Sequence, residues 1–226
     1  MKIKIFNKIH SFIKLKKDFF LLTNVLNHSQ YVFEENDLYI IPEDINLSDL
    51  EKKIKSRQNG MLNEVWFIKF FSQKLKVIIN GAVHITQALA PMCRICNYDV
   101  IILDPRNVFA NSKRFPEENI INKWSNDYLI KNPLDKHTAV VTLTHDPKID
   151  DPIIKLALEK KCFYIACLGS IKTHKARKER LRKFGFSDID LDNLNGPAGL
   201  DINAKSPEEI AVSILAELIM FTRIKK

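Results

Sequence analysis

The sequence predicts an α/β protein whose larger part is a three-layer, doubly wound parallel sheet. From residue 75 onward, short runs rich in Val and Ile alternate with amphipathic stretches of helical length. Polar or glycine-containing turns separate these segments, as in "NGA", "LDPR" and "LGS". Continuous apolar strands are typical of a sheet that is covered on both faces, and parallel strands need helical crossovers. Right-handed crossovers then give the strand order 3-2-1-4-5 for the first five strands.

The first half of this domain contains three predicted strands. A short buried strand covers 75–80, and a helix follows Gly81 and ends near Asn97. The β-rich run 99–103 is the second strand, and a short segment at 119–122 is the third.

The second half repeats the alternation. "TAVVTLT" at 138–144 is the clearest strand, a helix covers 147–161, and "CFYIACL" forms a strand that ends at Leu168. A strongly basic helix comes next. The last helix begins with a capping box, in which Ser206 is the N-cap, Pro207 the first helical residue and Glu209 the reciprocal acceptor. Its apolar face is expected to pack on the sheet through Ile210, Ala211, Ile214, Leu215 and Leu218.

Residues 1–70 form a small separate α+β unit in this interpretation, and residues 75–226 form the Rossmann-like domain. "DLYII" is a plausible strand and "LSDLEKKIKSR" a plausible helix of the small unit. The basic N-terminus is expected to be an amphipathic helix that covers part of a core, and a membrane-surface helix is the alternative. Lysines interrupt every candidate signal sequence there.

Composition excludes several classes of protein. No apolar run approaches the ~18 residues of a membrane span, and four cysteines in 226 residues are too few for a disulfide framework. These features fit a cytoplasmic protein. Cys93 and Cys96 form a C-x-x-C, but helical spacing places both on the apolar stripe of the first helix. They are therefore expected to be buried, reduced and metal-free, with a metal or redox site as the alternative.

The turn after the first strand resembles half of a dinucleotide fingerprint. Gly81 fits the pattern G-x-G-x-x-G, whereas Val83 and Thr86 occupy the other two glycine positions. Asp104 stands 23 residues after Gly81, where an acidic residue usually binds a ribose diol. Val83 opposes the usual pose because its side chain fills the space in which the backbone approaches a pyrophosphate.

A second candidate site lies where the basic helix begins. Gly169 and Ser170 precede residues 172–183, which carry a net charge of +6 from seven Lys or Arg and one Glu. The free amides of the helix and Lys172, His174 and Arg177 favour an anion there. A tight turn without a ligand and a nucleic-acid surface are the alternatives. His145 and Asp146 form either an acid–base pair or a simple helix cap. No nucleophile–base set or metal-spaced cluster stands out.

Five segments together resemble one family in their order along the chain. "GAVHITQALAPM", "ILDPRNVFANSKRFP", "TAVVTLTHDPKIDDP", "FYIACLGSIKTHKARKERLRKFGFS" and "GPAGLDINAKSPEEIAVSILAEL" are similar to the C-terminal Rossmann domain of the xanthine dehydrogenase accessory factor family, the XdhC/CoxI type. The resemblance covers about residues 75–220. It departs from the family at Val83 and Thr86, at Asn203 in place of the glycine of "LDIGA", and in having no cysteine before Cys93.

The resemblance implies an accessory protein that binds, protects and delivers the molybdenum cofactor (molybdopterin) and assists its sulfuration. It also implies a molybdenum hydroxylase and a cysteine desulfurase as partners, a homodimer, and no turnover reaction of the protein's own. The cofactor-binding residues that it implies are Gly81, His84, Asp104, Arg106, Thr144, His145, Asp146, Gly169, Ser170, His174, Arg177, Gly199 and Asp201, to which the residue pattern at the start of the basic helix adds Lys172.

Two alternatives remain from the residues alone. An NAD(P)-binding oxidoreductase or regulatory nucleotide-binding protein fits the fold and Asp104, and a nucleic-acid module would use the basic helix. We expect weak NAD binding because of Val83, and we expect phosphate or a pterin phosphate near Gly169 and Ser170 instead.

Overall fold

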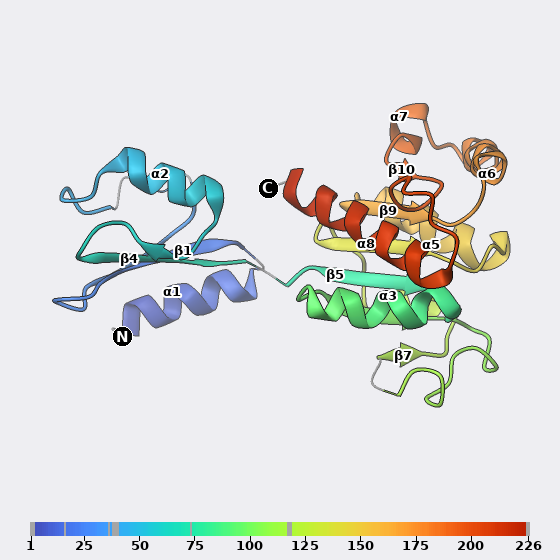
Figure 1. The fold of residues 1–226 in the computed structure, drawn as a ribbon, viewed down its shortest axis with the longest axis horizontal. Helices are drawn as coiled ribbons and strands as arrows, with labels where there is room; N and C mark the ends of the chain where they lie inside the picture. Colours follow the sequence, from blue (N-terminus) through green and yellow to red (C-terminus); the bar gives the residue numbers. More distant parts are fainter. Residues whose placement is uncertain are drawn as a thin grey trace. The chain divides into compact units, whose positions relative to one another are not determined.

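A computed structural model describes residues 3–15, 17–35, 37, 41–72, 74–116 and 119–224 (Figure 1). The chain divides into two compact units, Met1–Gln73 and Lys74–Lys226. The predicted strand "DLYII" falls mainly on residues 38–40, which lie outside the described ranges. No helix within those ranges is long and apolar enough to cross a membrane.

The smaller unit is a four-stranded antiparallel sheet with a helix on each face. Alternate residues of the first strand point to opposite sides, so that Phe20 packs under one helix with Leu50, and Phe19 packs under the other with Phe12. Both helices fall where the sequence predicts them. The strand order is β2-β1-β4-β3, and the elements are α1 (Ile3–Lys14), β1 (Phe19–Asn24), β2 (Gln30–Phe33), α2 (Leu47–Ser56), β3 (Gly60–Met61) and β4 (Trp66–Phe71).

The larger unit contains a six-stranded sheet in the order β10-β9-β8-β5-β6-β7. All its strand pairs are parallel. The predicted order of the first five strands is therefore confirmed, and β10 adds a sixth strand at the edge. The strands are β5 (Lys76–Asn80), β6 (Asp99–Leu103), β7 (Ile120–Ile121), β8 (Thr138–Thr142), β9 (Tyr164–Cys167) and β10 (Leu194–Asn195).

Helices cover both faces of this sheet, which confirms the three-layer Rossmann-like fold. Val77 and Ile79 of β5 belong to a core shared with α3 and α8, whereas Ile78 between them belongs to a core shared with α5 and α6. Figure 1 shows α3 and α8 side by side. The helices are α3 (His84–Ile95), α4 (Ser125–Lys131), α5 (Pro147–Glu159), α6 (Ile171–Lys183), α7 (Asp188–Leu191) and α8 (Pro207–Ile224).

The start of α8 has the predicted capping box. The Glu209 amide donates to the Ser206 hydroxyl at 3.2 Å, and the Ser206 amide donates to the Glu209 carboxylate at 2.9 Å. Ala211, Ile214 and Leu218 are fully buried against the sheet. The predicted apolar face is therefore confirmed.

The predicted ends of two helices are too late by two residues. Asn97 and Lys161 take left-handed φ values of 65° and 52°, so that α3 stops at Ile95 and α5 at Glu159. Cys96 thus caps the helix instead of continuing its buried stripe.

The prediction that both thiols of the C-x-x-C are buried is wrong for one of them. Cys93 is fully buried, whereas Cys96 is exposed because α3 ends before it. Cys162 and Cys167 are buried, and all four cysteines are thiols.

Candidate functional site

Gly81 follows β5 directly and lies against Leu143 and Thr144, which follow β8. Its φ is +125°, and a Cβ there would stand 2.9 Å from the methyl group of Thr144. Its amide donates to the carbonyl of Leu103 at 2.7 Å. Glycine is therefore required at this turn by the packing of neighbouring strand ends, whether or not a ligand approaches it.

Asp104 is fully buried and connects the first two turns of the sheet. One carboxylate oxygen accepts from the Ala82 amide at 2.8 Å and from Arg106 Nη2 at 2.7 Å. The other accepts from the backbone amide and Nε of Arg106, both at 2.9 Å. The pKa of Asp104 lies below its ordinary value because these hydrogen bonds outweigh the cost of burial. Both oxygens thus have protein donors.

The loop after β6 folds back over the first turn. The Arg114 guanidinium donates to the carbonyl of Ala82 at 2.6 Å and lies near the rings of Phe109 and Phe115. The Arg106 guanidinium also lies over one of these rings, 4.3 Å from the Phe109 ring centroid. The carboxylate of Asp104 and the carbonyl of Ala82, both beside this turn, are therefore each bound by an arginine of the chain itself. Arg114 was not predicted from the sequence.

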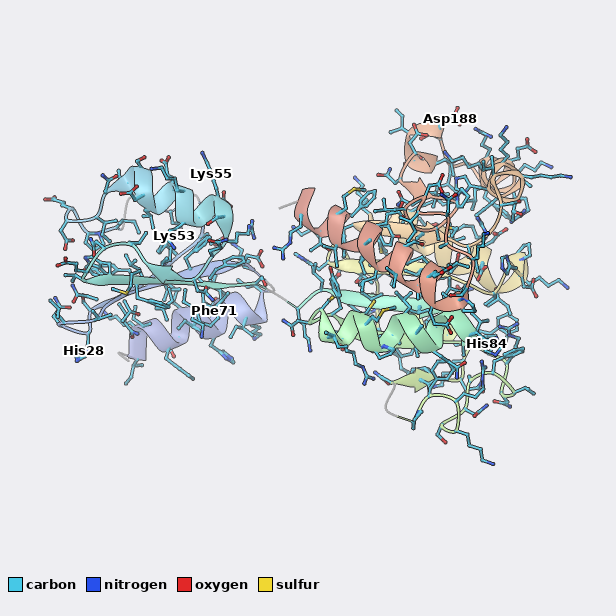
Figure 2. All side chains as sticks on the ribbon, viewed as in Figure 1. His28, Lys53, Lys55, Phe71, His84 and Asp188 are labelled. Atoms are coloured by element: carbon cyan, nitrogen blue, oxygen red, sulfur yellow. The ribbon has the colours of Figure 1, made fainter. Side chains whose placement is uncertain are left out.

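The two departures from the glycine fingerprint have structural roles. Val83 is the N-cap of α3 without a side-chain cap, and it packs partly buried against the core. Thr86 is fully buried, and its hydroxyl donates to the carbonyl of Gly81. His84, labelled in Figure 2, lies exposed at the first position of α3.

Asp150 connects the ends of β5 and β8, the two strands at which the sheet order reverses. One of its carboxylate oxygens accepts from Asn80 Nδ2 at 3.1 Å and from the Thr144 hydroxyl at 2.8 Å. Burial raises the pKa of Asp150 to about 6, although both hydrogen bonds and the nearby Arg177 charge act against the shift. Ligands of doubly wound folds bind outside this part of the sheet.

A pocket of about 300 Å³ opens beside Asp150, between α5 and α6. Arg177 lines it and is only 2% exposed. Its Nη2 donates to the carbonyl of Leu168 at 3.0 Å. Of the residues predicted from the sequence, His145, Lys172 and Arg177 meet here. The complete lining is His145, Pro147, Asp150, Asp151, Lys172, Thr173, Ala176, Arg177 and Arg180.

His174 does not join this pocket, contrary to the sequence-based prediction. It is buried beside Gly196, where a Cβ would overlap the imidazole ring. Burial, and then the charges of Arg177 and Lys178, lower the pKa of His174 to about 4. The ring is therefore neutral near pH 7 and adds no positive charge to the pocket.

Ser170 acts as the N-cap of α6, because its hydroxyl accepts from the Thr173 amide at 3.2 Å. Neither Ser170 nor Gly169 lines the pocket. Asp146 likewise caps α5 and accepts from the Lys148 amide at 2.9 Å, which favours the capping interpretation of the His145-Asp146 turn.

The last predicted turn faces α8. The Gly199 amide donates to the Glu217 carboxylate at 3.0 Å, and the Tyr164 hydroxyl donates to the same oxygen at 2.6 Å. Asp201 is exposed, and Asn203 has a left-handed φ of 57°. Asn tolerates this conformation better than most residues, which accounts for its presence where the family has glycine.

Much of the positive charge of α6 is paired within the chain. Arg180 forms two hydrogen bonds with Asp151, at 2.8 and 3.1 Å. Arg182 pairs with Asp188 at 2.8 Å, and Lys178 approaches Asp192 at 3.4 Å. The helix therefore presents a weaker cationic surface than its sequence indicates.

Asp150 was not predicted either, although the sequence contains a signal for it. It precedes Ile153, Ile154 and Ala157 by three, four and seven residues, which places it on the buried stripe of α5. A carboxylate on a buried stripe needs partners, and such residues cluster at functional sites. Among the described residues, no group of three or more His, Cys, Asp or Glu is arranged to hold a metal ion.

The profile of the XdhC Rossmann domain matches residues 77–218, which is more than half of the chain. The chain belongs to the XdhC family. Its XdhC domain has all the elements described above, from β5 to α8.

Two curated relatives have informative names. A protein from Bacillus subtilis, named as a probable component of xanthine dehydrogenase, is 27% identical over 86% of this chain and 58% of its own length. The "molybdenum cofactor insertion chaperone PaoD" of Escherichia coli is 35% identical over 38% of this chain and 27% of its own length. The chain thus spans less than two thirds of the length of either relative.

A solved structure has the same fold. A crystal structure described as a xanthine dehydrogenase from Bacillus halodurans superimposes with a TM-score of 0.70 at 24% identity. The match covers 99% of this chain and 65% of the other. It extends beyond the XdhC domain into the smaller unit.

Proposed function

We propose that this chain is an accessory protein that binds the molybdenum cofactor in the pocket between α5 and α6 and passes it to a molybdenum hydroxylase. Membership of the XdhC family supports an accessory role. The relative named a molybdenum cofactor insertion chaperone supports the choice of cargo.

One observation in the structure supports this pocket as the binding site. Arg177 is almost fully buried there, yet its Nε and Nη1 have no hydrogen-bond partner among the residues that the structure describes. A buried guanidinium with unpaired N–H groups is costly unless a ligand accepts from them. Molybdopterin offers acceptors in its phosphate and its pterin ring, and Lys172 at the exposed side of the pocket adds a second cation. The available groups therefore fit the organic part of the cofactor.

The geometry opposes a standard dinucleotide. Asp104 would have to give up bonds to Ala82 and Arg106 to accept a ribose diol. Arg114 would have to leave the carbonyl of Ala82 before a pyrophosphate reached the turn. Each exchange replaces a buried or partly buried, charge-assisted hydrogen bond, which makes tight NAD(P) binding unfavourable.

The proposal extends to the partners that the family resemblance implies. They are a client molybdenum hydroxylase, a cysteine desulfurase that supplies sulfur, and a second copy of this chain. Because no cysteine precedes Cys93, sulfur transfer through a thiol of the smaller unit is not part of the proposal.

Equilibrium titration of the full chain tests the proposal. Wild-type protein should bind molybdenum cofactor freshly released from a hydroxylase, and Arg177→Ala and Lys172→Ala should each weaken binding by about tenfold or more, because a charge-assisted hydrogen bond contributes about 1.5–3 kcal/mol. Lys175→Ala is the matched control, since Lys175 is exposed on the same helix and does not line the pocket. Micromolar NAD binding that neither pocket variant changes would contradict the proposal.

A further inference from the structure

Two residues that line one pocket carry three buried polar atoms for which the described part of the chain offers no hydrogen-bond partner. They are Oδ2 of Asp150 and the Nε and Nη1 of Arg177. Both residues line the pocket between α5 and α6, and each is only 2% exposed. Buried polar groups are nearly always satisfied in folded proteins, so one unmet acceptor and two unmet donors on residues that line one cavity point to a ligand with complementary groups.

Both side chains are held in place by their other atoms. Asp150 Oδ1 accepts from Asn80 Nδ2 and the Thr144 hydroxyl, at the ends of two adjacent strands. Arg177 Nη2 donates to the carbonyl of Leu168, which follows the third strand of this group. The free acceptor and the free donors are therefore fixed to the sheet before any ligand arrives, which lowers the entropic cost of binding.

A simple anion does not match this set of groups. A phosphate accepts from Arg177 but also places its negative charge beside the Asp150 carboxylate, where like charges repel. A ring that has N–H donors next to a carbonyl satisfies both residues at once. A 2-amino-4-oxopyrimidine ring has such an edge, and it occurs in pterins and in guanine.

We propose that Asp150 and Arg177 recognise the edge of a 2-amino-4-oxopyrimidine ring. Asp150 Oδ2 accepts from an N–H of the ring, and Arg177 donates to the carbonyl side. Lys172, which is exposed at the same pocket, is left for a phosphate attached to the ring. The choice of a pterin as the natural source of the ring rests on the proposed function, whereas recognition of the ring itself does not.

The test is a titration of the full chain with three probes: 6-hydroxymethylpterin, guanosine and inorganic phosphate. Asp150→Asn keeps the shape of the side chain and the oxygen that accepts from Asn80 and Thr144, but it replaces the free acceptor by an N–H donor. The variant should bind the pterin at least about tenfold more weakly, since a hydrogen bond to a charged group contributes about 1.5–3 kcal/mol. Its phosphate affinity should be unchanged or higher.

Two further variants complete the design. Glu159→Gln removes one negative charge from an exposed position of α5 that does not line the pocket, so its pterin affinity should stay within about twofold of wild type. Arg177→Lys keeps the charge but loses the planar set of donors, and it should weaken pterin binding independently of Asp150.

The outcomes separate this inference from the proposed function. Loss of pterin binding in Asp150→Asn and Arg177→Lys supports the inference. If the wild type binds guanosine but not the pterin, and both variants lose guanosine binding, the result supports recognition of the ring. The same result contradicts the molybdenum cofactor as the cargo. Equal pterin affinity in wild type and Asp150→Asn overturns the inference, even if the molybdenum cofactor binds. A wild type that binds phosphate alone, with tighter binding in Asp150→Asn, also overturns it.

Discussion

The substitution Asp150→Asn should change how the stability of the larger unit depends on pH. The folded protein raises the pKa of Asp150 from 3.8 to about 6, first because the carboxylate is buried. Between these two values the folded chain binds more protons at this site than the unfolded chain does. The contribution of Asp150 to stability is therefore fully present below about pH 3.8 and is lost as the pH rises to about 6.

The expected magnitude follows from the shift. It amounts to roughly two pKa units, and one unit corresponds to about 1.4 kcal/mol, so the wild type loses about 3 kcal/mol from this group. Asp150→Asn does not titrate and avoids this loss. Its free energy of unfolding, compared with that of wild type, should therefore rise by about 3 kcal/mol between pH 3.5 and pH 7.

The difference between the two proteins must be measured, because His174 has an opposite effect. Its pKa falls from 6.5 to about 4 on folding, so its contribution increases stability as the pH rises through the same range. Urea denaturation can be followed by Trp124 fluorescence in a Trp66→Phe background, so that the signal reports the larger unit. The contribution of His174 is the same in variant and wild type, and it therefore cancels in the difference between their free energies of unfolding. A difference that stays constant from pH 3.5 to pH 7 would refute the reasoning.

Three further predictions concern packing. Asp104→Ala should cost about 3 kcal/mol in urea denaturation because it leaves Arg106 without its buried partner, and a loss below about 1 kcal/mol would show that this contact matters little. Tyr164→Phe should cost about 1–2 kcal/mol because Glu217 loses a buried donor; unchanged stability would count against that bond. Cys96 alone of the four cysteines should react with a maleimide in the native protein, and mass spectrometry should find a single label, whereas two labels would contradict the burial of the others.

The order of strands was predictable because it depends on local patterns. Apolar runs that alternate with helical stretches over most of the domain determine a doubly wound sheet once right-handed crossovers are required. The short elements α4, α7 and β10 were not predicted, since four to seven residues, or two in a strand, carry too little periodicity to indicate structure.

The candidate site was only partly predictable, because its geometry depends on contacts between distant segments. His174 and Arg177 lie one helical turn apart on the same buried stripe, and periodicity does not tell which of them faces a cavity. Asp104 occupies the expected position after the second strand, but its partners are Arg106 and the Ala82 amide. That pairing depends on the path of the loop after β6, which no local rule determines.

Mass spectrometry of the ligand that remains on gently purified protein tests the central claim most directly. The wild type should retain a pterin phosphate, and Arg177→Ala, purified in the same way, should lose it. A nicotinamide dinucleotide retained equally by wild type and by Arg177→Ala would contradict the account.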